Sequence, residues 1–409
     1  MENINTKNFN LLSPNNERDQ INLGLTRMRL ALQKLNNPCL NIPAIQIIGT
    51  NGKGSICAFL ESILQYTEIN IGVTTSPHLF DICERIRVNK INIKRNQFEE
   101  LLRDMQNNLS ELSLTPFELI ICCGLVYFDT NNVNLLILEA GLGGRLDATT
   151  AHKLRPIIAI GHIGIDHTEY LGNSLEEITR EKVAVIEKGS HVISCNQNNI
   201  AKNIINDRVH KVGAKISWVE PLSNDWELGL KGNFQKQNGA VAVKVANLLV
   251  KNGLVIKEDD IRKALTNTKW KGRLEIINWK NKKILIDSAH NSSAAEVLAN
   301  ERKNWINQDK GVFWIIGVQK HKDINMIIKK LIQKIDTVLL VPVPNQKSWS
   351  LNEITEIMDY RLNNFIEFKN FKDALQYLRS LDEWPKCFPV LTGSIFLVSE
   401  FIKYSQINE

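Results

Sequence analysis

Short apolar segments that end abruptly in glycine or polar residues recur along the chain. They are nearly continuous rather than alternating, which is typical of strands buried on both faces of a parallel sheet. The predicted strands are 44–49 (AIQIIG), 135–141 (LLILEAG), 156–161 (PIIAIG), 283–289 (KILIDSA), 312–317 (VFWIIG), 337–343 (TVLLVPV) and 388–393 (FPVLTG).

Segments with helical periodicity lie between many of these strands. They are 56–66, 174–188, 238–253 and 323–335. Strands that alternate with helices predict an open α/β architecture. Ligands of such sheets bind at the carboxyl ends of the strands, where the glycine turns of this sequence fall.

The length of the chain predicts two domains. Its 409 residues exceed the roughly 250 to 300 residues at which a single hydrophobic core stops growing. A charge-dense stretch near residues 271–282 precedes a new series of strands. We therefore expect a larger domain at 1–276 and a smaller one at 277–409.

Composition narrows the class of protein. Hydrophobic residues make up 43% of the chain, enough for two cores, and a net charge of +6 describes a mildly basic surface rather than a nucleic-acid-binding tail. The seven cysteines are scattered through apolar runs, as in reduced cytosolic proteins. The polar N-terminal stretch 1–20 lacks the apolar centre of a signal peptide, and no apolar run reaches the roughly 20 residues that span a bilayer. We expect a cytoplasmic protein that binds neither nucleic acid nor membranes.

The sequence GTNGKGS, residues 49–55, sits between a predicted strand and a predicted helix. Gly49, Gly52 and Gly54 would let phosphate oxygens approach the backbone, Lys53 would add a full charge, and Ser55 offers a hydroxyl suited to Mg²⁺. The spacing is tighter than in the common phosphate-binding loop. The alternative is an ordinary glycine turn.

Two further polar groups follow predicted strands. Glu139 ends the strand before the glycine-rich turn of EAGLGGRLDATT, where an acid can hold Mg²⁺ or, alternatively, cap a helix. Asp166 and His167 follow another strand in GIDHTEY. A lone histidine is more often structural than a ligand.

In chain order, LGLTRMRLAL, GTNGKGS, TSPHLFDICERIRVN, TPFE, EAGLGGRLDATT, GIDHTEYLGNSLEEITREK, WKGRLE, DSAHN and LTGSIFLVSE span residues 22 to 400. Together they resemble the folylpolyglutamate synthase and dihydrofolate synthase family, within the Mur ligase superfamily. The resemblance implies a P-loop-type ATPase domain with a mainly parallel sheet and the pterin site at 1–276. It implies a smaller Rossmann-like glutamate ligase domain at 277–409.

The implied activity is ATP-dependent amide formation. ATP converts a carboxylate of a folate, or of dihydropteroate, to an acyl phosphate, which the amino group of L-glutamate attacks. Positioning and charge neutralisation account for most of the catalysis in such phosphoryl transfers. The family also implies a monomer whose partners are these small molecules.

The resemblance assigns residues to ATP and to metal. The ATP-binding residues are Gly49, Thr50, Asn51, Gly52, Lys53, Gly54, Ser55, Asn238, Arg273 and Asp287. Ser55 and Glu139 match ligands of one Mg²⁺ and His167 matches a ligand of a second. Lys182 matches a lysine that the family carbamylates with CO₂; the alternative is a solvated helix lysine paired with a glutamate.

Substrate and catalytic residues are assigned in the same way. The substrate-binding residues are Ser76, Pro77, His78, Arg85, Phe117, His290 and Ser394, and the catalytic residues are Lys53, His167, Lys182 and His290. The segment Thr75–Leu79 resembles a loop over the pterin and ATP. Phe117 is equally consistent with plain core, and Arg85 and His290 with salt bridges between the domains.

The chain departs from the family pattern at four places. Thr150 stands where the family reads Asn in DATN, EKVAV replaces EKAGI, Ser288 replaces the glycine of DGAHNP, and His321 replaces the first acid of DKD. Ser288 adds a side chain beside Asp287, which is assigned to ATP. Nucleotide affinity is therefore the property that we expect to differ most from the family.

Two alternatives to a folate ligase follow from the same residues. One is a Mur-type ligase for another carboxylic acid, which the segment TSPHL and the lack of an extra N-terminal substrate domain disfavour. The other is a non-catalytic nucleotide-binding scaffold, which would be expected to have lost Lys53, Glu139 or His167.

Overall fold

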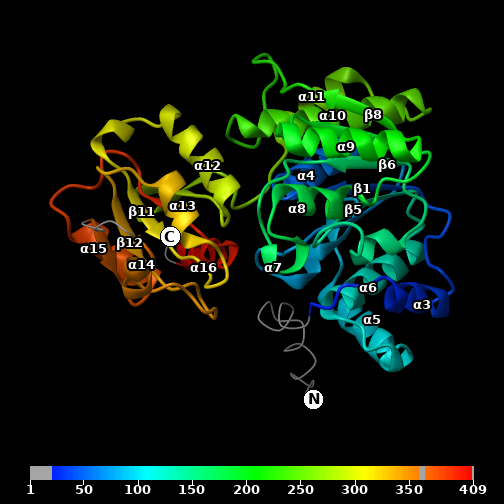
Figure 1. Cartoon of the computed structure of the whole chain (residues 1–409), viewed down its shortest axis with the longest axis horizontal. Coiled ribbons are helices and arrows are strands. Elements are labelled where there is room, and N and C mark those ends of the chain that lie inside the picture. Colours follow the sequence, from blue (N-terminus) through cyan, green and yellow to red (C-terminus); the bar gives the residue numbers. More distant parts are fainter. Residues whose placement is uncertain (1–20, 359–363, 408–409) are drawn as a thin grey trace. The chain divides into compact units, whose positions relative to one another are not determined.

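The computed structural model describes residues 21–358 and 364–407. The polar stretch 1–20 considered above therefore lies outside the described residues. The described chain divides into two compact units (Figure 1), each treated by itself below. Of the described residues, the N-terminal unit comprises 21–229 and 235–269, and the C-terminal unit comprises 230–234, 270–358 and 364–407.

The N-terminal unit is built on an eight-stranded sheet of order β4-β3-β2-β5-β1-β6-β7-β8. All neighbours from β2 to β8 are parallel, whereas β3 and β4 pair antiparallel at one edge. The strands are β1 (Ala44–Ile48), β2 (Ile71–Thr74), β3 (Ile86–Val88), β4 (Ile91–Asn92), β5 (Leu135–Glu139), β6 (Ile157–Ile160), β7 (His191–Cys195) and β8 (Lys215–Val219).

Helices pack on this sheet. They are α3 (Thr26–Lys34), α4 (Lys53–Leu64), α5 (Arg95–Asn108), α6 (Pro116–Thr130), α7 (Thr168–Leu171), α8 (Leu175–Val183), α9 (Asn199–Val212), α10 (Phe234–Lys251) and α11 (Glu258–Asn267), with 3-10 turns at Ile82–Arg85, Ser110–Leu112 and Ala148–Ala151. Every residue of β1, β2, β5 and β6 is buried, so both faces of the central sheet are covered. The prediction of a mainly parallel sheet is confirmed.

The strand order decides where the site lies. The first strand, β1, lies between β5 and β6, with Ile47 in register with Glu139 and Ile48 with Ile160 (Figure 1). Because these neighbours are parallel, their carboxyl ends meet at one edge of the sheet. The loop 49–55, Glu139 and residues 161–167 therefore leave the sheet side by side.

The C-terminal unit contains a six-stranded sheet of order β13-β12-β11-β14-β10-β9, in which only β9 is antiparallel to its neighbour. Its strands are β9 (Glu275–Trp279), β10 (Lys282–Ile286), β11 (Phe313–Ile316), β12 (Thr337–Leu340), β13 (Phe365–Glu367) and β14 (Val390–Thr392). Its helices are α12 (Ser292–Glu301), α13 (Ile324–Leu331), α14 (Leu351–Ile357), α15 (Phe371–Ser380) and α16 (Ile395–Ile407), with 3-10 turns at Arg302–Asn304 and Gln308–Lys310. This is the smaller α/β unit that the sequence predicts.

Two general expectations can be compared with the structure. All seven cysteines are buried and unbridged, as predicted for reduced thiols. Within residues 21–358 and 364–407, no helix combines the length and apolar character needed to cross a membrane.

Candidate active site

The loop 49–55 has a backbone that only glycine adopts without strain. Gly49 has φ 144° and Gly52 has φ 87°. A Cβ atom on Gly49 would lie 3.2 Å from the backbone of Gly161, which follows β6. Because α4 begins at Lys53, the amides of its first turn point out of the helix end, where the helix dipole is positive. Such an arrangement favours phosphate.

The loop is tied to the segment that follows β6. The backbone N–H groups of Thr50 and Asn51 donate to the carbonyl oxygen of His162 at 2.8 and 3.0 Å. The hydroxyl of Thr50 donates to the carbonyl oxygen of Gly164 at 2.9 Å. The loop is therefore held in one place by residues 162–164, which lead directly to His167.

Two predicted catalytic lysines meet at one carbonyl group of this loop. The Nζ atoms of Lys53 and Lys182 donate to the carbonyl oxygen of Gly49 at 3.2 and 3.1 Å. Lys53 also donates to the carbonyl oxygen of Thr50 at 3.3 Å. The structure thus brings Lys182, from α8, to the loop 49–55.

Lys182 is buried, with 4% of its surface exposed. The alternative of a solvated helix lysine is therefore wrong. The pKa of Lys182 is lowered from 10.5 to about 7, because burial disfavours the ammonium and because Lys53 is nearby. The carboxylates that act in the opposite direction are those of Asp166, Asp147 and Glu181. A large fraction of Lys182 is therefore a neutral amine near pH 7.

Glu139 is the last residue of β5 and is almost completely buried. Its Oε2 atom accepts a hydrogen bond from the backbone N–H of Ser76 at 3.0 Å. This bond joins the strand end to the start of the segment Thr75–Leu79. Ser55, in the first turn of α4, is also buried.

His167 has a left-handed backbone, with φ 51° and ψ 43°, immediately before α7. Its backbone N–H donates to Oδ1 of Asp166 at 2.9 Å, and its Nε2 lies 3.8 Å from Oδ2 of the same carboxylate. Asp166 is buried, whereas 35% of the His167 side chain is exposed. The imidazole therefore lies near the Asp166 carboxylate and is partly accessible to a ligand.

The donor set at this sheet edge consists of a hydroxyl, a carboxylate and an imidazole: Ser55, Glu139 and His167. Among the described residues, no three His, Cys, Asp or Glu side chains form a preformed metal cage. Mg²⁺ usually binds through one or two protein ligands together with water and substrate phosphates. These residues therefore fit Mg²⁺ that arrives with a nucleotide.

The segment Thr75–Leu79 carries three of the predicted substrate residues. The peptide bond between Ser76 and Pro77 is cis. The imidazole Nδ1 of His78 accepts a hydrogen bond from Nε of Arg85 at 3.0 Å, and Arg85 is buried. Because Nδ1 is the acceptor, a neutral His78 carries its proton on Nε2. The structure brings these two predicted substrate residues together.

The shape of the same segment is held by Glu84, which the sequence reasoning missed. Its carboxylate accepts hydrogen bonds from the backbone N–H groups of Leu79, Phe80 and Asp81, at 2.8, 2.9 and 3.0 Å. Three such bonds fix the backbone after His78 without a helix or strand. The signal was the capping pattern DICE, with an acid three residues after Asp81.

Phe117 lies in the first turn of α6 and is half-buried. Its ring lies against Gly141, where a Cβ atom would be 2.7 Å from Cζ of Phe117. The ring also packs on the core formed with α3, α5 and β5. Phe117 therefore supports the glycine turn after Glu139, and a contact with pterin stays a prediction.

Asp287 follows β10 in the C-terminal unit and organises the turn that carries Arg273. Its Oδ2 atom accepts from the backbone N–H of Leu274 at 2.9 Å and its Oδ1 atom from that of Ala289 at 2.8 Å. Burial raises the pKa of Asp287, and the nearby Arg273 opposes that shift. One carboxylate oxygen thus holds the backbone next to the predicted ATP residue Arg273, and the other holds the backbone at Ala289.

His290 and Ser394 leave the sheet from adjacent strands, β10 and β14. Nδ1 of His290 donates to the carbonyl oxygen of Ser288 at 2.8 Å, so a neutral His290 has its basic nitrogen at Nε2. Ser394 is buried, and its hydroxyl oxygen accepts from the backbone N–H of Phe396 at the start of α16. The structure gives Ser394 a helix-capping contact in addition to its predicted role.

Asn238 lies against the phosphate-binding loop. A Cβ atom on Gly52 would be only 2.4 Å from Oδ1 of Asn238. Its Nδ2 atom donates to Oε1 of Gln235 at 2.9 Å. Gln235 is a second residue that the sequence reasoning missed.

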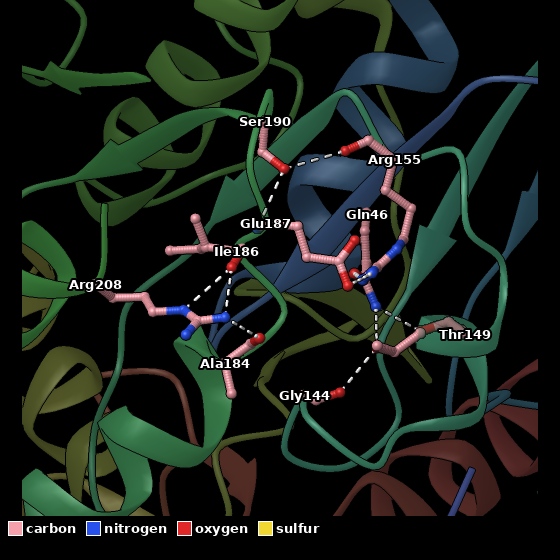
Figure 2. A network of polar contacts seen from close by, with 10 residues as sticks. Gln46, Gly144, Thr149, Arg155, Ala184, Ile186, Glu187, Ser190 and Arg208 are labelled. Carbon is pink, nitrogen blue, oxygen red and sulfur yellow. Dashed lines mark hydrogen bonds and ion pairs between the residues drawn. The ribbon is translucent and has the colours of Figure 1, made fainter. Parts of the chain in front are cut away.

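A buried polar network supports the turn after Glu139 (Figure 2). The side-chain amide of Gln46, in β1, donates to the hydroxyls of Thr149 and Thr150 at 2.9 and 2.7 Å and accepts from Arg155 at 2.6 Å. The hydroxyl of Thr150 donates to the carbonyl oxygen of Gly144 at 2.8 Å. No local sequence signal identified Gln46 or Arg155.

This network reaches the backbone around Lys182. A Cβ atom on Gly144 would lie 2.3 Å from the carbonyl oxygen of Lys182, so the turn and α8 touch through backbone. On the other side, Arg208 donates to the carbonyl oxygens of Ala184 and Ile186 at 3.0 and 2.7 Å (Figure 2). The end of α8 thus packs against the Gly144 turn on one side and is held by hydrogen bonds from Arg208 on the other.

Comparison with known proteins places these features in a family context. Residues 272–404 match the family model described as the dihydrofolate synthetase C-terminal domain. The chain is 31% identical to dihydrofolate synthetase of Saccharomyces cerevisiae, over 94% of this chain and 98% of that protein. It is 30% identical to dihydrofolate synthase/folylpolyglutamate synthase of Buchnera aphidicola subsp. Schizaphis graminum, over 92% of each.

A solved structure shows the same fold. It is that of bifunctional folylpolyglutamate synthase/dihydrofolate synthase from Yersinia pestis, complexed with AMPPNP and Mn ion. The TM-score is 0.81 and the identity 25%, with 94% of each chain covered.

Proposed function

Because the chain belongs to the folylpolyglutamate synthase and dihydrofolate synthase family, we propose that it is an ATP-dependent ligase that joins L-glutamate to dihydropteroate or to a folate. The observation that carries the proposal is the placement of the loop 49–55 at the end of the central strand, beside Glu139 on the adjacent strand. The Yersinia pestis relative binds an ATP analogue and a divalent metal, which supports the same ligands here.

The proposed ligation has two steps, formation of an acyl phosphate and formation of the amide. A carboxylate oxygen of the pterin substrate attacks the γ-phosphorus of ATP, ADP leaves, and an acyl phosphate forms. The neutral amine of glutamate then attacks the acyl carbon, phosphate leaves with the bonding electrons, and the amine proton passes to a base. The loop amides and Lys53 bind the phosphates, and Arg273 is suited to phosphate because its guanidinium can form two parallel hydrogen bonds.

We assign the metal ligands to the three donors at the sheet edge. Ser55 and Glu139 would hold one Mg²⁺, and His167, whose backbone N–H donates to Asp166, would hold a second. When bound, Mg²⁺ neutralises phosphate charge and polarises the transferring group.

The state of Lys182 supports the carbamylation proposed for it. A neutral amine is the form that attacks CO₂, and the N–C bond forms with loss of one proton. A lysine with a pKa of about 7 supplies that form at neutral pH, whereas a lysine at its ordinary value of 10.5 does not. Carbamylation would replace a buried cation with an anion beside the loop.

Dihydrofolate formation is the activity for which relatives give the most support. The family model and the Saccharomyces cerevisiae relative carry that name, and the Buchnera relative carries both names. We propose that the chain forms dihydrofolate from dihydropteroate and also extends folates by further glutamates.

The test is ADP release and product analysis with purified protein, ATP, Mg²⁺ and L-glutamate. The proposal expects turnover that requires dihydropteroate or a reduced folate, with a new glutamyl amide detected by mass spectrometry. Lys53→Ala should lower turnover by at least about a hundredfold while the fold is retained, whereas Lys188→Ala, at an exposed position, should not. ADP release that ignores both pterins, or full ligation by Lys53→Ala, would refute the assignment.

A further inference from the structure

Gln235 lies in the first turn of α10 and is completely buried, although its side chain is polar. Its Nε2 atom donates to the hydroxyl oxygen of Ser55 at 3.2 Å, and its Oε1 atom accepts from Nδ2 of Asn238 at 2.9 Å. A buried amide must satisfy both of its ends, because each unsatisfied group is costly. The side-chain amide is therefore fixed in one orientation.

The two partners of Gln235 both lie at the loop 49–55, although only Ser55 belongs to it, because Asn238 is on the same helix as Gln235. Ser55 is the last residue of the loop, and Asn238 lies against Gly52 near its middle. We propose that Gln235 is a positioning residue, which orients the Ser55 hydroxyl for Mg²⁺ and the Asn238 amide for the nucleotide. This inference rests on the proposed function of the loop as the ATP site.

The direction of the hydrogen bonds defines what Gln235 does. Because Nε2 donates, the Ser55 oxygen uses one lone pair toward Gln235 and keeps the other for a cation. Because Oε1 accepts from Nδ2 of Asn238, the amide of Asn238 cannot rotate without losing that bond. One side chain thus sets the orientation of two others that come from different parts of the chain.

The experiment is calorimetric titration of ADP into the full chain, with and without Mg²⁺. Gln235→Met keeps the length of the side chain and removes both hydrogen bonds. We expect it to weaken ADP binding about tenfold with Mg²⁺ present and to reduce the gain in affinity that Mg²⁺ gives. The matched control is Gln237→Met, two residues further along the same helix and half-exposed, which should bind as the wild type does.

The outcomes separate positioning from a purely structural role. A structural role would lower the melting temperature but leave the Kd of the folded protein unchanged, so a Kd within twofold of the wild type overturns the inference. So does an equal loss in Gln237→Met. If the wild type itself ignores ADP, it is the proposed function that fails.

A second variant covers the case in which Gln235→Met does not fold. Gln235→Glu keeps the acceptor for Asn238 but replaces the donor to Ser55, so the serine must turn its own hydroxyl hydrogen toward the carboxylate. We expect the Mg²⁺-dependent part of the ADP affinity to fall in this variant. An unchanged Mg²⁺ dependence would contradict the inference.

Discussion

Lys182→Met is expected to stabilise the N-terminal unit at acidic pH while it abolishes ligation. The wild-type lysine is buried beside Lys53, and its pKa is lowered from 10.5 to about 7. Between these two values the unfolded chain binds a proton at this position and the folded chain does not. Unfolding therefore takes up a proton, and the contribution of Lys182 makes the protein more stable as pH rises.

The magnitude follows from the two pKa values. Below pH 7 the full difference applies and destabilises the folded state by about 5 kcal/mol. At pH 9 the folded-state lysine is neutral, and protonation stabilises the unfolded-state lysine by only about 2 kcal/mol, so the penalty falls to that value. Methionine also removes the hydrogen bond to the Gly49 carbonyl oxygen, worth about 2 kcal/mol. The variant should therefore gain about 3 kcal/mol at pH 6 and almost nothing at pH 9.

The assay is urea denaturation, followed by circular dichroism, in nucleotide-free and CO₂-depleted buffers from pH 6 to pH 9. Lys188→Met, at an exposed position beyond the same helix, is the matched control and should follow the wild type at every pH. The reasoning is refuted if Lys182→Met is less stable than the wild type at pH 6. It is also refuted if the difference between the two proteins does not shrink as pH rises.

Two departures from the family pattern give further predictions. Thr150→Val removes the hydroxyl that bonds the Gly144 carbonyl oxygen and one N–H of Gln46, so the free energy of unfolding should fall by about 2 kcal/mol. Thr150→Ser keeps the hydroxyl and should lose less than half of that. Urea denaturation checks both variants, and equal midpoints for the valine and serine variants would contradict the account. Ser288→Gly removes the hydrogen bond to the Gly272 carbonyl oxygen at 3.0 Å and adds backbone freedom. It should raise the KM for ATP several-fold and leave the KM for glutamate unchanged, and an unaltered KM for ATP in steady-state assays would show that Ser288 does not support the Arg273 turn.

Strands that are buried on both faces were predictable, because burial of every residue favours a nearly continuous apolar run. The strands β1, β5 and β6 have this property. The strands that escaped prediction are short or polar. The edge strand β8, Lys215–Val219, is mostly half-exposed, and β2 contains Gly72, whose missing side chain leaves room for the ring of Phe128. Such strands are specified by their neighbours in space and not by a local pattern.

The residues of the candidate site divide in the same way, into those that a local sequence pattern identifies and those that only the fold identifies. The loop 49–55, Glu139 and His167 were identified because each lies in a motif a few residues long. Gln46 and Gln235 were not, because Gln46 is a single polar residue in an apolar strand and Gln235 is one of several polar residues at the start of α10. Their partners are 103 and 180 residues away in the sequence. A buried glutamine is recognised as functional only when the fold shows which groups its amide joins.

The two departures from the family pattern, Thr150 and Ser288, make the same kind of contact. Each places a buried hydroxyl where it donates to the carbonyl oxygen of a glycine in a tight turn, Gly144 at 2.8 Å and Gly272 at 3.0 Å. The first turn touches the backbone of Lys182 and the second precedes Arg273. A glycine turn has few side-chain contacts of its own. An added hydrogen bond to its carbonyl oxygen therefore restricts the backbone next to Lys182 in the first case and next to Arg273 in the second. These substitutions therefore restrain the predicted catalytic and ATP-binding groups instead of displacing them, which argues for a working ligase and against a degenerate nucleotide-binding scaffold.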